Sequence, residues 1–139
     1  MLRVMLIDEG LELLTEEQCV ELLAGGGIGR VGVTIAGLPV ITPVTFVYYD
    51  GAVVFRTGEG SKLRAASAGA VVAFEIDEYS AETKTGWSVL AVGHSREIVD
   101  EEQIAEMNGT APVPWADGER LHYVQLQPEM LTGRRIVAV

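Results

Sequence analysis

The chain has 139 residues, which is the size of one domain, and 48% of them are hydrophobic. Its net charge of −10 disfavours nucleic acid and anionic membrane surfaces as partners, because both are themselves negative. No apolar run approaches the roughly 18 residues that a membrane helix needs. The apolar start carries Arg3 and stops at Asp8, too short for a secretory signal. We therefore expect one cytoplasmic domain over residues 1–139, with no membrane or nucleic-acid partner.

The first predicted element is a short helix after a lead-in, residues 1–14, that has no clear period. Thr15 and Gln18 have the spacing of a capping box, in which two side chains satisfy the first backbone donors of a helix. Apolar residues follow at helical spacing, and the glycines at 25–27 end the pattern. Cys19 falls on the apolar face, so we expect a buried, inert thiol.

From Gly29 onwards the apolar period becomes two, which is typical of strands. Strands are predicted at 29–35, 38–49, 52–57, 70–77, 86–99, 121–127 and 133–139, with 78–85 as a polar loop. Asp50 and Gly51 form a strong hairpin signal, since both central positions of a type I′ turn need positive φ. Pro39 and Pro43 place the second strand at an edge or a bulge. A change of phase near Gly93 indicates a bulge in the long strand around it.

Two further short helices are predicted between strands. Ser61 caps one that Gly69 ends, and Asp100 caps an acidic one that runs to about Met107. Residues 108–120 are predicted as a loop. Consecutive strands joined mostly by short turns indicate an antiparallel sheet, and closure into a barrel would hide its edges. The predicted fold class is mainly β, a β-barrel with a few short helices.

Basic and hydroxyl residues gather where the third strand gives way to a glycine loop and a helix. Three of the ten Lys and Arg residues of this acidic chain fall within 56–64. Arg56, Thr57, Ser61 and Lys62 supply a forked guanidinium, two hydroxyls and an ammonium, and the turn adds backbone donors. These groups favour a phosphate site. The alternative is a solvated helix start whose positive charges balance surplus acid, and spacing alone does not choose.

Other motifs receive structural interpretations. Residues 27–32 match G-x-G-x-x-G, but here a helix ends and a strand begins, the reverse of a dinucleotide site. His94 and His122 lack ligand spacing with Cys19 or a carboxylate, so no metal site is predicted. Because His94 alternates with apolar Val92, we expect it inside the barrel. No catalytic acid, base or nucleophile is identified.

The two tryptophans and the long second strand indicate covered surfaces. Trp87 begins a long strand and either packs in the core or covers a ligand, whereas Trp115 lies in a loop beside Pro114, typical of an interface or ligand cover. Both faces of the strand at 38–49 are largely apolar. One face can line the barrel while the other needs a partner, which predicts a homodimer.

Several segments, in their order and spacing, resemble the pyridoxamine 5'-phosphate oxidase-like FMN-binding split barrels. The matching segments are 29–32, 40–46, 54–63, 72–77, 85–89 and 132–136, and the resemblance covers roughly residues 12–137. It implies an antiparallel, Greek-key-like split barrel and a homodimer with FMN at each end of the interface. The pattern around Arg134 and Arg135 differs from the substrate-phosphate signature of the true oxidases, so the resemblance is to a related branch.

The resemblance also implies a set of cofactor-binding residues. They are Arg56, Thr57, Ser61 and Lys62 for the phosphate, Pro43, Val44 and Thr45 beside the isoalloxazine, and Trp87, Ser88 and, more loosely, Trp115 for contacts that include the second subunit. The phosphate set coincides with the cluster that chemistry alone singled out.

The function implied by the resemblance is an FMN-dependent oxidoreductase that acts on a small-molecule substrate or electron donor. A deazaflavin-dependent reductase of the same fold and a non-catalytic flavin- or haem-binding protein are the alternatives. A deazaflavin has a longer, more acidic tail that would need a wider basic groove. With only ten basic residues in the chain, FMN is favoured over deazaflavin.

Overall fold

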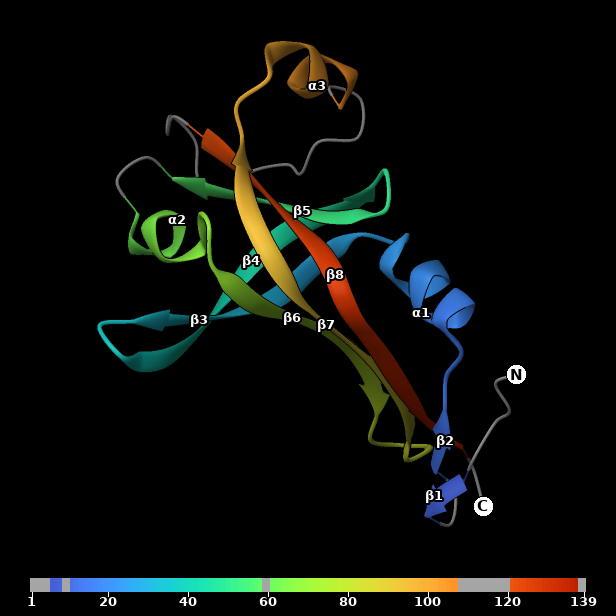
Figure 1. The fold of residues 1–139 in the computed structure, drawn as a ribbon. Helices are drawn as coiled ribbons and strands as arrows, with labels where there is room; N and C mark the ends of the chain where they lie inside the picture. The colour runs from blue at the N-terminus through green and yellow to red at the C-terminus, as the bar shows by residue number, and fades with distance from the viewer. Residues whose placement is uncertain (1–5, 9–10, 59–60, 108–120, 138–139) are drawn as a thin grey trace.

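A computed structural model describes residues 6–8, 11–58, 61–107 and 121–137 (Figure 1). The strands are β1 (Leu6–Asp8), β2 (Leu11–Leu13), β3 (Gly27–Ile35), β4 (Leu38–Tyr49), β5 (Ala52–Gly58), β6 (Val71–Ser80), β7 (Thr85–Ile98) and β8 (Leu121–Ile136). The helices are α1 (Glu16–Leu23), α2 (Lys62–Ser67) and α3 (Glu101–Glu106).

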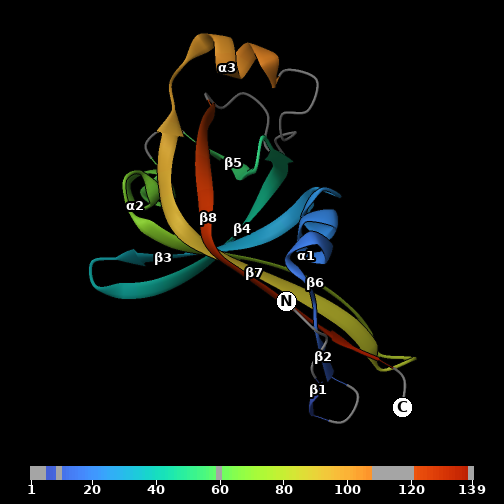
Figure 2. The same cartoon turned by 45° about the vertical axis from the view of Figure 1, so that its right-hand side comes forward.

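Six antiparallel strands close into a barrel, as the sequence predicts. The strand order is β8-β5-β4-β3-β6-β7, and pairing of β7 with β8 closes the ring. β5 and β6 are consecutive in the chain but are not neighbours in the barrel, so the connection that contains α2 crosses over (Figures 1 and 2). This crossover gives the Greek-key-like order and places α2 beside the ends of β5 and β7.

The local signals explain most element boundaries. Thr15 and Gln18 form the predicted capping box of α1, and Ser61 and Asp100 cap α2 and α3. At the β4–β5 hairpin, Asp50 has φ 51° and Gly51 has φ 78°, the two positive values that the turn requires.

The two prolines of β4 lie in its half-paired part. β4 pairs with β3 from Leu38 to Phe46, but its ladder with β5 runs only from Tyr49 to Phe46. Pro39 and Pro43 therefore lie where, among the described residues, β4 has one neighbour. The prediction of an edge position is confirmed, because a residue without an N–H is tolerated there.

The end of the chain differs from the prediction of two closing strands. β8 is one strand over Leu121–Ile136. The bulge predicted near Gly93 is present, but the additional residue is on β8: Val92 pairs with Met130 and Gly93 with Pro128, so Glu129 is left over. The bulge lets the strand pass through Pro128 without ending, and a Cβ on Gly93 would lie 2.0 Å from the carbonyl oxygen of Gln127.

Three smaller expectations are also wrong. The lead-in forms two short strands, and β2 pairs with the end of β8. β6 and β7 extend into the predicted polar loop and leave only residues 81–84 as a turn. His94 lies outside the barrel, 69% exposed, and its Nδ1 contacts Glu129. Odd-numbered residues of β7 line the barrel, so Val92 is also on the outer face.

The core fills the barrel and continues under α1. Buried residues of the barrel and α1 form one cluster: Cys19, Leu23, Val31, Val33, Val44, Phe46, Val53, Phe55, Val72, Phe74, Ile76, Val89, Ala91, Val124 and Leu126. α1 packs closely on β8, since a Cβ on Gly133 would lie 2.7 Å from the sulfur of Cys19. The thiol is fully buried, which confirms the predicted burial of Cys19, and burial raises its pKa.

A second, smaller core lies outside the barrel beneath α3. It consists of Val54, Ile98 and Met107 with half-buried Val47, Tyr49, Ile104 and Tyr123. α3 thereby covers the outer face of β4, β5 and β8 at one end (Figure 1). In the part of the chain that the structure describes, no helix has the length and apolar character to cross a membrane.

Candidate cofactor site

The candidate site lies where β4 and β5 part. Their ladder ends at the pair Phe46 and Phe55, so Pro43–Thr45 on one strand and Arg56–Gly58 on the other are not paired across the split. Val44 is buried in the core, whereas Pro43 is exposed and Thr45 half-buried on the outer face. The backbone of Pro43–Thr45 is thus the part of the predicted ring contact that faces an open edge.

Arg56 points to the outer face of β5. Its guanidinium donates a hydrogen bond from Nη2 to the hydroxyl of Tyr123, at 3.0 Å, and lies 5.1 Å from the centroid of the Tyr123 ring. This contact holds the cation at the edge of the core beneath α3. Tyr123 was not predicted from the sequence. It could have been found only from the pairing of β5 with β8, where Tyr123 is the partner of Arg56.

Thr57 points the other way, into the end of the barrel. Its side chain is 4% exposed, and Oγ1 is buried without a hydrogen-bond partner among the described residues. A buried hydroxyl that makes no hydrogen bond lowers the stability of the fold by about 1–3 kcal/mol, so a threonine at this position needs an explanation. The structure therefore places the side chains of Arg56 and Thr57, which the sequence analysis grouped in one phosphate site, on opposite faces of β5.

Ser61 and Lys62 lie beside the end of β5, at the start of α2. Ser61 Oγ accepts from the backbone N–H of Arg64 at 2.9 Å, so its own proton remains available to donate. Lys62 is exposed and forms no ion pair within the described ranges. α2 has only six residues, so the side chains rather than a helix dipole must supply most of the attraction for an anion.

α2 is attached to β7 through its C-terminal end. Ser95 on β7 donates from its hydroxyl to the carbonyl oxygens of Ser67 and Ala70, and the Gly69 N–H donates to the Ser95 carbonyl at 2.9 Å. These contacts hold the C-terminal end of α2 against β7.

An ion-pair cluster lies between α2, β7 and β8, and sequence reasoning missed it. The Arg64 guanidinium contacts Glu97 Oε1 at 2.9 Å, and His122 Nδ1 lies 2.8 Å from Glu97 Oε2. Hydrogen bonds from Arg64 and then His122 lower the pKa of Glu97. No sequence spacing relates these three residues, because the barrel alone brings them together.

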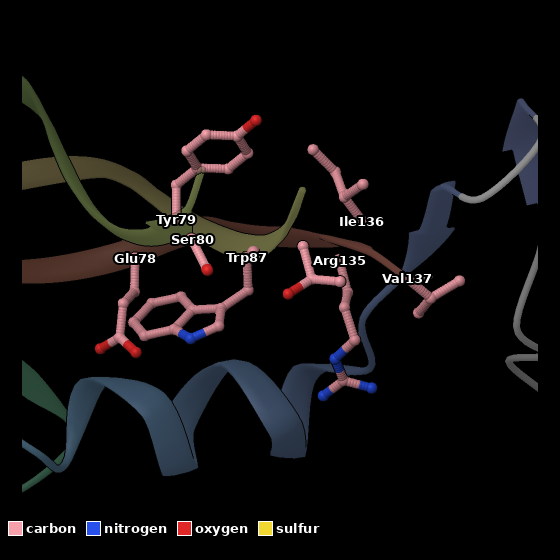
Figure 3. Close-up of a pocket in the computed structure, with 9 residues that line it drawn as sticks. Glu78, Tyr79, Ser80, Trp87, Arg135, Ile136 and Val137 are labelled. Atoms are coloured by element: carbon pink, nitrogen blue, oxygen red, sulfur yellow. The ribbon is translucent and has the colours of Figure 1, made fainter. Parts of the chain in front are cut away.

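Trp87 lies in a different part of the molecule, in a cleft of about 410 Å³ at the end of the β6–β7 hairpin. It pairs with Arg135 on β8 and Glu78 on β6. In Figure 3 the indole lies between the side chains of these two residues, while Tyr79 and Ile136 point to the other side of the strands. Ser88 follows, half-buried and paired with Arg134.

The structure does not bring Trp87 and Ser88 to Thr57 of the same chain. Thr57 pairs with His122 at one end of β8, and Trp87 pairs with Arg135 near the other. These positions on β8 are separated by about 40 Å of extended strand. Figures 1 and 2 show α2 on the side of the barrel, well apart from the tip of the β6–β7 hairpin. Trp115 lies outside the described residues.

The groups around the split fit a phosphate ester joined to a planar ring. Thr57 offers a buried hydroxyl that lacks a partner, Ser61 a free proton, and Lys62 an exposed ammonium. The unpaired edge of Pro43–Thr45 offers backbone groups to the polar rim of a ring. A flavin nucleotide has both parts. Among the described residues no group of three or more His, Cys, Asp or Glu side chains is arranged to hold a metal ion.

Comparison with known proteins decides the family. The model of the pyridoxamine 5'-phosphate oxidase family matches residues 15–135. The chain belongs to this family. A curated relative, an uncharacterized protein of Mycobacterium tuberculosis, is 38% identical over 130 residues, which span 90% of this chain and 85% of the relative.

Solved structures share the fold across nearly the whole chain. The FAD-binding protein of Mycobacterium smegmatis is 34% identical with a TM-score of 0.76, and the match covers 89% of this chain and 97% of that one. The FAD- and haem-binding protein of the same organism has a TM-score of 0.70 over 87% of this chain and 71% of its own. At 16% identity this second likeness shows the fold alone. The predicted family and split-barrel fold are thus confirmed.

Proposed function

We propose that this protein is a flavin-nucleotide-binding oxidoreductase that uses FMN and forms its cofactor site between two copies of the chain. The phosphate lies against Thr57, Ser61 and Lys62, with Arg56 at the outer edge of the split. The isoalloxazine lies along Pro43–Thr45.

The observation that carries the proposal is the buried Oγ1 of Thr57, which has no hydrogen-bond partner among the described residues. Burial of this hydroxyl without a partner is unfavourable, and it occurs near Ser61, which can donate a hydrogen bond, and Lys62, which is exposed. A phosphate oxygen accepts from hydroxyl and ammonium groups together, and such charge-assisted bonds are stronger than neutral ones. A cofactor phosphate gives Thr57 the partner that the protein alone does not supply.

The open edge of β4 supports the placement of the ring. Pro43 has no N–H, and the backbone around it has no partner on β5. Pockets commonly orient a ligand through such backbone donors and acceptors. The apolar side chain of Ile41, 75% exposed, lies on the same outer face of β4 as Pro43 and Thr45 and favours a partner that covers this face.

A second copy of the chain completes the site. The cleft around Trp87 lies too far from Thr57 to serve the same cofactor within one chain. In a symmetric dimer each hairpin can reach the partner's split, so that the indole of Trp87 stacks on the ring and Arg135 lies near its edge.

The chemistry is divided between cofactor and protein. Flavins carry out hydride and electron transfer themselves when bound. The residues of this chain then bind the phosphate, orient the ring and exclude water from its covered face. This division is consistent with a site in which we identify no catalytic acid, base or nucleophile among the described residues.

FAD is a second candidate cofactor, favoured by the 34% identical relative that is named for FAD binding. The phosphate contacts proposed above are compatible with either flavin nucleotide. FAD would require room for a second phosphate and an adenosine beyond Lys62.

Purification and cofactor exchange test the proposal. The protein, stripped of bound small molecules and incubated with FMN or FAD, should take up close to one flavin per chain with the flavin absorption bands. Mass spectrometry of the material that is released from freshly purified protein then identifies the native cofactor. A protein that takes up neither flavin would contradict the proposal, and a haem spectrum would replace it with the haem-binding alternative.

A further inference from the structure

We propose that His122 is a further phosphate-binding residue of this site, and that Glu97 and Arg64 hold its ring in place for that task. The inference rests on the proposed flavin-nucleotide site. It adds a residue that neither the sequence motifs nor the phosphate cluster contains.

His122 and Thr57 are direct partners across the β5–β8 ladder. Directly paired residues of antiparallel strands point to the same face, with Cβ atoms about 4.5–5.5 Å apart. His122 Nε2 and Thr57 Oγ1 are both buried, and neither makes a hydrogen bond to the other or to another described group. One polar group placed between them would satisfy both atoms.

The other nitrogen of His122 is already used. Nδ1 lies 2.8 Å from Glu97 Oε2, while the second oxygen of Glu97 is occupied by Arg64 at 2.9 Å. The His122 side chain is only 16% exposed. The ring is therefore fixed at Nδ1 by a carboxylate that is itself fixed, and Nε2 is its only remaining polar atom.

This arrangement suits an anion. With Nδ1 donating to the Glu97 carboxylate, Nε2 accepts in the neutral ring and donates in the imidazolium. A phosphate placed against Nε2 favours the imidazolium, because an adjacent negative charge stabilises the charged form. The charged groups that face the ring among the described residues are Glu97 from β7 and, behind it, Arg64 from α2. In this arrangement His122 binds the ligand and Glu97 is a positioning residue.

Two substitutions separate the nitrogens of the ring. His122→Asn can retain a donor near the Nδ1 position for Glu97 but removes the polar atom at the Nε2 position. His122→Gln places a donor near Nε2 and thereby tests rescue by the conservative variant. The readout is the affinity of the stripped protein for FMN and for riboflavin, which lacks the phosphate.

We expect His122→Asn to weaken FMN by about tenfold or more, the effect of losing one charge-assisted hydrogen bond, and to leave riboflavin affinity unchanged. His122→Gln should recover part of the loss. Glu97→Gln, which keeps the size of the side chain, should also reduce FMN affinity selectively. Equal losses for both ligands, or unchanged FMN affinity in His122→Asn, would overturn the assignment.

A second measurement keeps His122 unchanged, so its result does not depend on whether the His122 variants fold. The chain has two histidines, so His94→Gln leaves only the His122 ring signals in a nitrogen-15 NMR spectrum. FMN should shift the Nε2 resonance strongly, and riboflavin should not. If FMN binds but leaves Nε2 unshifted, the inference is wrong while the flavin site stands. If neither FMN nor FAD binds, the proposed function itself fails.

Discussion

Arg56 and Thr57 are neighbours in the chain, yet their side chains lie on opposite faces of β5. The guanidinium of Arg56 contacts Tyr123 beneath α3, and the hydroxyl of Thr57 is buried at the end of the barrel. A ligand can meet both only at the edge of the strand, and this edge is open because the β4–β5 ladder stops at Phe55. The split in the barrel thus leaves one edge at which a single ligand can reach both side chains.

Replacement of Thr57 by valine should change stability and binding in opposite directions. Valine has nearly the same shape but no hydroxyl, so the stripped protein loses an unsatisfied buried group and gains about 1 kcal/mol of stability. A gain of that size raises Tm by about 2–4 °C in a domain of this length. FMN affinity should fall about tenfold. Thr34→Val, at an exposed position of β3, is the matched control and should alter neither. A Thr57→Val protein that is less stable without flavin would show that the hydroxyl has a structural partner.

Removal of basic side chains should separate specific contacts from general charge. Lys62→Ala and Arg56→Ala should each weaken FMN by about ten- to a hundredfold, as charge-assisted hydrogen bonds are worth about 1.5–3 kcal/mol. Arg96→Ala removes the same charge from an exposed position on β7 and should have little effect. Fluorescence titration of the stripped proteins measures all three. Unchanged affinity in both Lys62→Ala and Arg56→Ala would remove the phosphate site from this segment.

A mixed dimer should reveal which copy supplies Trp87. A stacked indole quenches flavin fluorescence, so the Trp87→Phe homodimer should bind flavin with brighter emission. A dimer of one Lys62→Glu chain and one Trp87→Phe chain has a single phosphate site, in the Trp87→Phe chain. If the indole comes from the partner, this site is quenched as in the wild type. Bright emission from the mixed dimer would place Trp87 in the same chain as the cofactor, and a monomeric protein would exclude the arrangement altogether.

Glu75 should make stability depend on pH. Burial raises the pKa of Glu75 to about 7, helped by the hydrogen bond and charge of Asp77 and opposed by Arg30 at 3.4 Å. The folded chain therefore retains this proton above the ordinary value of 4.5, and stability falls as pH rises from there to about 7. Hydrogen bonds with Glu75 and Arg30 are the chief cause of the lowered pKa of Asp77. The stability that ionised Asp77 contributes is therefore lost only as pH falls below the ordinary pKa of about 3.8.

Thermal unfolding of Glu75→Gln at two pH values checks this assignment. The substitution should raise Tm relative to wild type more at pH 8 than at pH 5, because only at pH 8 does the half-buried side chain of the wild type carry a negative charge. Glu82→Gln, on the exposed turn between β6 and β7, should give equal differences at both values. A Glu75→Gln difference that does not change with pH would contradict the raised pKa.

Local sequence signals predict the elements of this fold well. The capping box at Thr15, the hairpin at Asp50 and the cap at Ser61 each depend on residues a few positions apart, so the chain itself reveals them. The course of β8 could not be read in the same way. Pro128 looks like a strand end, and only the extra residue Glu129 opposite Gly93 shows how the strand continues.

Some residues of the candidate site could likewise be predicted from the sequence, and others could not. The cluster of Arg56, Ser61 and Lys62 is contiguous in the chain, and its composition alone suggests phosphate chemistry. His122 and Glu97 belong to strands that are neighbours only in the closed barrel. The opposite directions of Arg56 and Thr57 follow from strand alternation, but which of them faces the barrel interior depends on the register with β8.

The central claim is that the end of β5 and the start of α2 bind the phosphate of a flavin nucleotide, and the affinity of the wild-type protein for FMN compared with riboflavin tests it most directly. The two ligands share the ring and the ribityl chain and differ only in the phosphate. Two or more charge-assisted contacts to the phosphate predict binding of FMN at least about a hundredfold tighter than riboflavin. Equal affinity for the two ligands would contradict the account.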